Sequence, residues 1–219
     1  MKKYPKIQTL YNRDAEGDYG VIPDQVRCPE FGLVKRWLFT EKVDGRNHRI
    51  ILHSEGQVEH RGRTDKAQFS KAQMDAALGI VTEDRLRAQF DPGLEVILYG
   101  ELYGPGVQKG GKYRGDIGFA LFDVRVADWW LNWSTICEIA SDLGLKTVPY
   151  LGQREYYLPT CQAELLDIFG NGGDSVISEN KGVIPEGIVA RTDPLLLMRN
   201  GDRLMWKLKV KDFRREEGE

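Results

Sequence analysis

Strand-like segments outnumber helical ones in this chain, and the two kinds do not alternate. Runs rich in β-branched and aromatic residues occur at 37–40, 49–52, 58–63, 94–103, 119–126, 150–158, 187–192 and 205–210. Helical patterns begin after the N-cap candidates Ser70, Thr82, Ser134 and Thr160. Parallel strands need a long, usually helical, crossover, and the order of these segments lacks that rhythm. The sequence therefore predicts an α+β fold, with mainly antiparallel sheets flanked by helices, in one domain over residues 1–219.

The composition excludes two classes of protein. The 219 residues are 41% hydrophobic and 29% charged, as in ordinary globular proteins, and no apolar run is long enough to span a membrane. The formal net charge of −2 excludes a chain that is basic throughout, so a nucleic-acid partner requires a local basic patch. Cys28, Cys137 and Cys161 show neither zinc nor disulfide spacing, which favours a reducing compartment. We expect a soluble, cytoplasmic monomer.

Lys42 stands at the end of the first strand-like run and is followed by Asp44 and Gly45. An Asp-Gly pair between two strand-like runs is a strong hairpin signal, because both turn residues then need a positive φ. In that interpretation Lys42 is a solvated lysine at a strand end. The alternative is a catalytic lysine, and other segments of the chain bear on the choice.

The last strand-like run alternates apolar and basic residues. Trp206, Leu208 and Val210 would face the core, whereas Lys207, Lys209 and Lys211 would share the other face. Lysines in such a row repel one another, so the row needs either solvent or an anion. Both an edge strand protected from aggregation and a phosphate-binding strand fit this pattern.

Acidic residues interrupt or end other strand-like runs. Glu101 lies within an apolar run and is costly to bury without a partner, unless it falls on the solvent face. Asp123 ends a second run, and Glu186 precedes a third. Together with the lysines, these carboxylates indicate a cleft with balanced charges, although a structural ion-pair network would give the same pattern.

In this order, the segments resemble the motifs of the covalent nucleotidyltransferases, the superfamily of polynucleotide ligases and mRNA capping enzymes. The matching segments are 42–45, 61–62, 99–101, 119–123, 186–189 and 207–209, and the resemblance spans residues 37–211. The loop 104–110 is similar to that of RNA ligases. Residues 210–219 are too few for the OB-fold domain that follows in DNA ligases and capping enzymes. The resemblance therefore favours the ATP-dependent RNA ligase branch, with a single adenylation domain and a nucleotide cleft between sheets.

The resemblance implies a covalent mechanism. Lys42 would attack the α-phosphate of ATP to form lysyl-AMP, AMP would pass to an RNA 5′-phosphate, and an RNA 3′-hydroxyl would then displace AMP. A lysine in water is almost entirely protonated at neutral pH, so burial and neighbouring cations must help Lys42 to act as a nucleophile. Lys207 and Lys209 would fill that role and hold the phosphate oxygens. Mg²⁺, with Mn²⁺ as an alternative, would neutralise the leaving pyrophosphate.

The resemblance also implies nucleotide-binding roles. Glu41 would read the adenine edge, Arg61 would contact the sugar or a phosphate, and Glu101 would hold the ribose. Phe122 would stack on adenine, although an ordinary core aromatic is an equal alternative. Glu186 would be the carboxylate linked to the metal ion. The three histidines, at 48, 53 and 60, follow no ligand spacing and receive no role.

The RNA contacts are predicted from charge. Lys109, Lys112 and Arg114 lie in a glycine-rich loop, where they would follow a phosphate backbone or simply be solvated. The basic residues Lys211, Arg214 and Arg215 lie among acids near the end of the sequence, which favours solvation.

Two other functions fit the same motifs. The first is a minimal DNA-nick ligase or a capping-type guanylyltransferase. The second is a non-catalytic nucleic-acid binder that keeps the fold, although such a protein has no chemical reason to keep Lys42, Lys207 and Lys209 with Glu101 and Glu186.

Overall fold

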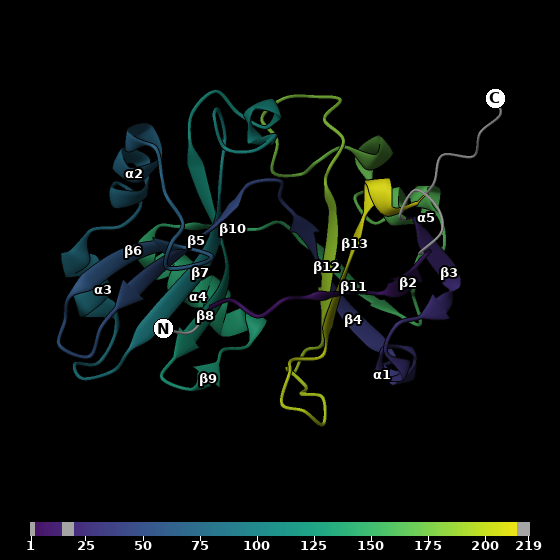
Figure 1. Ribbon diagram of the computed structural model, residues 1–219, viewed down its shortest axis with the longest axis horizontal. Helices are drawn as coiled ribbons and strands as arrows, with labels where there is room; N and C mark the ends of the chain where they lie inside the picture. The colour runs from purple at the N-terminus through teal and green to yellow at the C-terminus, as the bar shows by residue number, and fades with distance from the viewer. Residues whose placement is uncertain (1–2, 15–19, 214–219) are drawn as a thin grey trace. The chain divides into compact units, whose positions relative to one another are not determined.

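The computed structural model describes residues 3–14 and 20–213 (Figure 1). The chain divides into two compact units. Unit 1 comprises Met1–Pro5, Asp44–Val148 and Ser178–Asn180, and unit 2 comprises Lys6–Val43, Pro149–Ile177 and Lys181–Glu219. Each unit contains a sheet whose strand pairs are mostly antiparallel, so the predicted α+β class is confirmed. The expectation of a single domain stays a prediction.

Unit 1 is built on a six-stranded sheet in the order β10-β8-β7-β5-β6, with β9 paired to β8 (Figure 1). Its strands are β5 (Arg46–Leu52), β6 (Val58–Gly62), β7 (Val96–Tyr103), β8 (Gly118–Val126), β9 (Trp129–Trp130) and β10 (Lys146–Thr147). The helices are α2 (Lys71–Leu78), α3 (Glu83–Gln89) and α4 (Trp133–Leu143), with a short 3₁₀ turn, η1 (Gly110–Lys112). The helix α4 packs on β8 through its buried face, as its apolar spacing predicted.

Local capping signals set the helix boundaries of unit 1. Ser70 caps α2 in a reciprocal capping box with Gln73, and Thr82 caps α3, both as predicted. The predicted cap of α4 is wrong: the Asn132 side chain accepts the Thr135 N–H, and Ser134 instead donates its hydroxyl to Asn132. Asn and Ser are about equally good N-caps, so the local sequence did not distinguish the two positions.

Unit 2 contains a five-stranded sheet in the order β1-β13-β12-β4-β11 and a separate pair, β2-β3. Its strands are β1 (Gln8–Thr9), β2 (Tyr11–Arg13), β3 (Val21–Val26), β4 (Arg36–Lys42), β11 (Tyr150–Glu155), β12 (Gly187–Arg191) and β13 (Met205–Lys209). The helices are α1 (Pro29–Leu33) and α5 (Gln162–Asp167), with 3₁₀ turns η2 (Asn171–Gly173) and η3 (Val210–Asp212).

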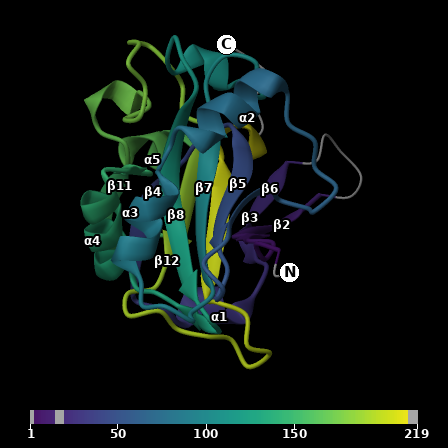
Figure 2. The same ribbon diagram turned by 90° about the vertical axis from the view of Figure 1, so that its left-hand side faces the viewer.

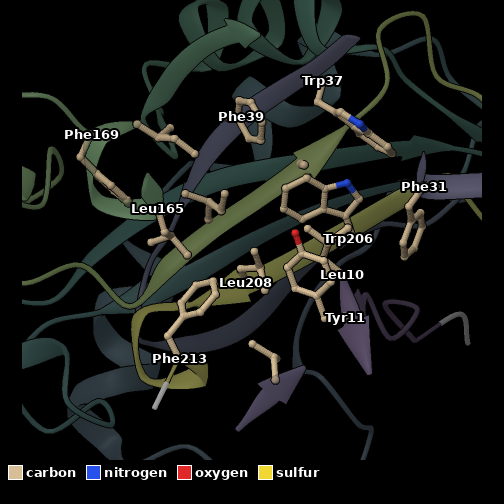
Figure 3. Packing of buried hydrophobic residues seen from close by; sticks show 14 of the residues in the cluster. Leu10, Tyr11, Phe31, Trp37, Phe39, Leu165, Phe169, Trp206, Leu208 and Phe213 are labelled. Carbon is tan, nitrogen blue, oxygen red and sulfur yellow. The ribbon is translucent and has the colours of Figure 1, made fainter. Parts of the chain in front are cut away.

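Alternate residues of these strands form the core of unit 2 (Figure 3). Trp206 and Leu208 of β13 are fully buried in it, as the period-two pattern predicted. The Trp206 ring meets those of Trp37 and Phe39 of β4 at tilted angles, with centroids 5.5 and 5.8 Å apart. The opposite face of the same strands therefore carries the lysines.

The predicted hairpin at Asp44 and Gly45 is wrong. β4 ends at Lys42 and pairs with β11 and β12, whereas β5 begins at Arg46 and pairs with β6 and β7. The Asp-Gly segment thus carries the chain from one sheet to the other, and neither residue has a positive φ. Gly45 is needed for space instead, because a Cβ there would lie 2.3 Å from the Leu102 carbonyl oxygen.

Other segments of unit 2 also differ from the expectation. β13 lies between β1 and β12, so the edge-strand interpretation is wrong, and Lys211 falls in η3 rather than in the lysine row. β11 ends at Glu155. Thr160 does not cap α5, because its hydroxyl and N–H both donate to the Glu164 carboxylate. Arg214 and Arg215 lie outside the described residues. Within the described ranges, no helix is long and apolar enough to cross a membrane.

Candidate active site

Strand register in unit 2 brings together residues from distant parts of the chain. Gly187 of β12 pairs with Lys42 of β4 on one side and with Lys209 of β13 on the other. Glu186 immediately precedes Gly187, so it enters the sheet between the two lysines. The structure therefore brings close together residues whose motifs had been matched only by their order along the chain.

The Glu186 carboxylate joins both lysines. Its Oε2 lies 2.5 Å from the Lys42 Nζ, and its Oε1 lies 2.6 Å from the Lys209 Nζ. Burial acts to raise the pKa of Glu186, but the charge of Lys42 and the hydrogen bonds from both lysines outweigh it, so the pKa lies below its ordinary value. The side chains of Lys42, Glu186 and Lys209 are 21%, 13% and 22% exposed, so a ligand can reach this ionised cluster.

The backbone around Glu186 fixes the cluster. Gly187 has a φ of +154°, and a Cβ there would lie only 2.0 Å from the Leu208 carbonyl oxygen. The Val210 N–H donates to the Glu186 carbonyl oxygen at 3.0 Å. The glycine after the acid is thus required by close packing against β13.

A second carboxylate, that of Asp212, holds the backbone of Lys209. It is 2% exposed, accepts the Lys209 backbone N–H at 2.9 Å, and accepts the Arg13 guanidinium at 2.6 Å. These bonds end β13 at Lys209 and turn the chain into η3. None of the sequence motifs had indicated Asp212 or Arg13. The signal that could have identified Asp212 is an acid three residues after Lys209.

Lys207 lies on the same face as Lys209, two residues earlier in β13. The usual rise of a strand places their Cα atoms roughly 7 Å apart. Lys207 pairs in register with Val189 of β12 and with Thr9 of β1. Lys207 therefore adds a third lysine to the face that carries Lys42 and Lys209, and lysine side chains suit a phosphate group.

Glu41 has a different environment from that of Lys42, its neighbour in sequence. It is 1% exposed and lies on the core side of β4. Its carboxylate accepts the Ser175 hydroxyl at 2.5 Å and the N–H groups of Val176 and Ile177 at 2.9 and 3.1 Å. Glu41 therefore anchors the loop 175–177, and an adenine contact by its carboxylate would compete with these donors.

In unit 1, the predicted residues Arg61 and Glu101 share one face of the sheet. The register pairs Arg61 with Arg49, and Arg49 with Tyr99, which is two residues before Glu101. The Arg61 guanidinium donates from Nε to the Glu59 carboxylate at 2.8 Å. The fully buried Arg49 was not predicted, because an arginine at the start of a strand resembles a surface residue.

Phe122 and Asp123 contact a residue from the start of the chain. The Tyr4 hydroxyl donates to Asp123 at 2.6 Å, and Tyr99 and Phe122 lie around the Tyr4 ring, with centroids 5.1 and 5.0 Å from it. Asp123 is 1% exposed, whereas Phe122 is only partly buried. No motif or pattern in the sequence indicated Tyr4.

The loop residues predicted to contact RNA differ in their availability. Lys109 is exposed, and the Lys112 Nζ lies 4.9 Å from the centre of the Tyr113 ring. Arg114 pairs with Asp116 at 2.5 Å and with Glu179 at 3.7 Å. Two acids thus offset the charge of Arg114.

Two of the three histidines, His48 and His60, contact each other. The His48 Nε2 lies 3.0 Å from the His60 Nδ1, and His48 is fully buried. Burial, followed by the charges of His60 and the nearby arginines, lowers the pKa of His48 to about 3, and burial also lowers the pKa of His60. No cluster of three or more His, Cys, Asp or Glu able to hold a metal ion occurs among residues 3–14 and 20–213.

Comparison with known proteins agrees with the fold. The family model described as RNA ligase matches residues 35–209. Among solved structures, a mutant RNA ligase of Naegleria gruberi with ATP and Mn is 19% identical, with a TM-score of 0.63, over 94% of this chain and 57% of that chain. An archaeal ATP-dependent RNA ligase is also 19% identical, with a TM-score of 0.64, over 97% of this chain and 49% of that chain. The chain thus spans about half the length of these relatives. No curated protein sequence matches it.

Proposed function

The chain belongs to the RNA ligase family, and we propose that it joins RNA ends by an ATP-dependent reaction through lysyl-AMP on Lys42. The observation that carries the proposal is the ionised cluster, in which Lys42 and Lys209 share the Glu186 carboxylate. Lys42 is half-buried, lies beside the Glu186 carboxylate and can still be reached by a ligand, and such a lysine is suited to attack an anionic substrate.

In the proposed first step, the Lys42 Nζ leaves Glu186 and gives one proton to solvent. The neutral amine then attacks the α-phosphorus of ATP, so that an N–P bond forms and the bond to pyrophosphate breaks, and the nitrogen gives a second proton to solvent. The positive charges of Lys207 and Lys209 offset the negative charge that develops on the phosphate oxygens. In the later steps AMP passes to an RNA 5′-phosphate, and a 3′-hydroxyl forms the phosphodiester bond and releases AMP.

The residues fit a divalent cation. Glu186 is ionised, as its lowered pKa indicates, and carboxylate oxygens together with substrate phosphates are the usual ligands of Mg²⁺. When bound, Mg²⁺ or Mn²⁺ would neutralise the negative charge of the pyrophosphate. To hold such an ion, Glu186 would release one of its lysines, which is also what frees Lys42 to act.

The roles of the other candidates rest on the resemblance to the family. We assign the ribose to Glu101, the sugar or a phosphate to Arg61, adenine stacking to Phe122 and the adenine edge to Glu41. We propose a reducing, cytoplasmic location from the sequence, because Cys28, Cys137 and Cys161 lack the spacing of a disulfide framework. A monomer remains the simplest assembly and is measurable by sedimentation.

The experiment that tests the function compares nucleotide donors. The protein is incubated with radiolabelled ATP, GTP or NAD and Mg²⁺, and the label bound to protein is measured. We expect label from ATP only, in an acid-labile and base-stable bond typical of a phosphoramidate, and none on Lys42→Ala. Label from GTP would indicate a capping-type enzyme, and label from NAD another ligase class. Absence of label from every donor would support the non-catalytic alternative.

The RNA specificity is tested separately. Adenylated protein is offered nicked RNA duplexes and nicked DNA duplexes with the same sequence. Faster sealing of the RNA nick supports the proposal, and faster sealing of the DNA nick would contradict it.

A further inference from the structure

One part of unit 1 carries exposed cations that the residues around them do not neutralise. Arg63, Lys66, Lys71 and Lys109 are all exposed. Within the part of the chain that the structure describes, none of these four side chains has an ion pair or hydrogen bond. Most other basic groups of this unit are engaged, including Arg61 with Glu59 and Arg114 with Asp116. This difference separates the four cations from the predicted RNA loop residues Lys112 and Arg114.

A buried arginine holds the segment that presents Arg63 and Lys66. The Arg49 Nε donates to the Gly62 carbonyl oxygen at 2.7 Å, and its Nη2 donates to the Asp65 carboxylate at 2.7 Å. Arg49 is 0% exposed, so the two bonds fix both ends of the turn from inside the sheet. The same contact offsets the Asp65 charge, and the pKa of Asp65 is lowered by its bond to Arg49. The acid between the two exposed cations therefore supports the turn rather than neutralising them.

A second buried side chain links this segment to the loop that carries Lys109. Gln73 of α2 donates to the Gly106 carbonyl oxygen at 2.9 Å and accepts from the Arg46 guanidinium at 3.3 Å. The start of α2, where Lys71 lies, is thereby tied to the loop three residues before Lys109. Both views show α2 and this loop at the same end of unit 1 (Figures 1 and 2).

Cations carried on an anchored backbone suit a polyanion better than cations on a flexible segment, because less conformational entropy is lost on binding. A sequence-independent phosphate backbone needs positive charges on a fixed surface and no base contacts. Asp75 is an exposed acid on α2, four residues after Lys71. The chain as a whole has a formal net charge of −2, so the positive charge of this surface differs in sign from the net charge of the chain.

We propose that Arg63, Lys66, Lys71 and Lys109 form a docking surface for the phosphate backbone of the RNA substrate, here named the basic platform. This inference rests on the proposed function. It differs from the RNA contacts predicted from the sequence because it adds Arg63, Lys66 and Lys71 and leaves out Lys112 and Arg114. The platform binds RNA by charge, and the joining specificity comes from other residues.

The test measures RNA affinity against salt. Fluorescence anisotropy with a labelled, single-stranded RNA carrying a 5′-phosphate is recorded from low to moderate salt for the unchanged protein, R63Q/K66Q and K71Q/K109Q. A matched control, R27Q/R199Q, removes the same charge from exposed positions of unit 2. Each platform pair should weaken binding at low salt by at least about tenfold and reduce the salt slope by about 1.4, at about 0.7 for each lost contact. The control pair should change neither quantity by more than about twofold.

Adenylation of the same samples with ATP and Mg²⁺ distinguishes failure of the platform from failure of the proposed function. If the protein is adenylated but the platform variants bind RNA with the same affinity and salt slope as the control, the platform is overturned. If the protein takes up no label but the platform variants bind RNA more weakly than the control, the result supports the docking surface and contradicts the proposed ligase function. A third variant, Arg49→Lys, keeps the positive charge but loses the two-point anchor, so weaker RNA binding with an unchanged salt slope would support the role of the fixed turn.

Discussion

Two polar clusters of this protein, one in each unit, illustrate different ways of burying titratable groups. In unit 2, the Glu186 carboxylate remains charged, because its contacts with Lys42 and Lys209 compensate for its burial. In unit 1, His48 and His60 remain neutral, because burial lowers the pKa of both rings. The first cluster is partly exposed, whereas His48 is fully buried. A charged cluster within reach of solvent can exchange a partner for a ligand, whereas the fully buried ring of His48 can only support the fold.

Replacement of Glu186 should have the largest effect. Glu186→Gln leaves Lys42 and Lys209 without their shared anion, and it removes the carboxylate proposed to hold the metal ion. We expect the rate of adenylation to fall at least about 100-fold, equivalent to about 2.7 kcal/mol. The measurement is the growth of adenylated protein in an intact-mass time course with saturating ATP.

The matched change in the other cluster is His48→Gln. Because His48 is 0% exposed, it cannot contact a nucleotide, and adenylation should stay within about twofold at a temperature where the variant is folded. Similar losses for both variants would remove the distinction between the clusters.

Variants of Lys207 and Lys211 test which lysines act together with the charged cluster. Lys207→Ala should reduce adenylation about tenfold, because it removes a cation from the face of Lys42 and Lys209. Lys211→Ala should have almost no effect, because Lys211 lies in η3, outside the row. The two rates are compared under the same conditions, and equal effects would favour a merely solubilising role for the lysines.

Asp212 should act through Lys209. Asp212→Ala removes the acceptor of the Lys209 N–H and the partner of Arg13, and we expect adenylation to slow about fivefold. In a Lys209→Ala background, the same change should cost little more, because the side chain that it positions is absent. Additive losses in this double-mutant cycle would indicate a general effect on stability.

The two clusters should also differ in the pH at which they affect stability. His48 has a folded pKa of about 3, below its ordinary value of 6.5, so the unfolded chain binds the proton first as the pH falls. The stabilising effect of the neutral ring is complete above pH 6.5, and between pH 6.5 and 5.5 about 1 kcal/mol is lost. Urea unfolding at both pH values measures this loss, which His48→Gln should reduce.

Glu186 should act in a more acidic window. Its folded pKa is lowered, so its contribution is present above its ordinary value of 4.5 and is lost as the pH falls through the folded pKa. Glu186→Gln should therefore leave the loss between pH 6.5 and 5.5 unchanged. A change in that window would contradict the assignment of the two clusters to different pH ranges.

Much of the fold was predictable from local patterns. Alternation with period two identified the core face of β13, and capping residues located the starts of α2 and α3, because these signals depend on neighbours a few residues away. The order of the motifs also placed Lys42, Glu186 and Lys209 among the candidates before their distances were known.

The tertiary structure decided which distant partners these residues meet. The Asp-Gly segment after Lys42 has the local pattern of a hairpin, but pairing with β11 and β12 on one side and with β6 and β7 on the other assigns its flanking strands to different sheets. The Tyr4–Asp123 bond joins residues 119 positions apart, and the Arg13–Asp212 pair joins residues 199 apart. A sequence pattern records what a side chain is and which face it takes, whereas its partner across the fold depends on how whole strands pack.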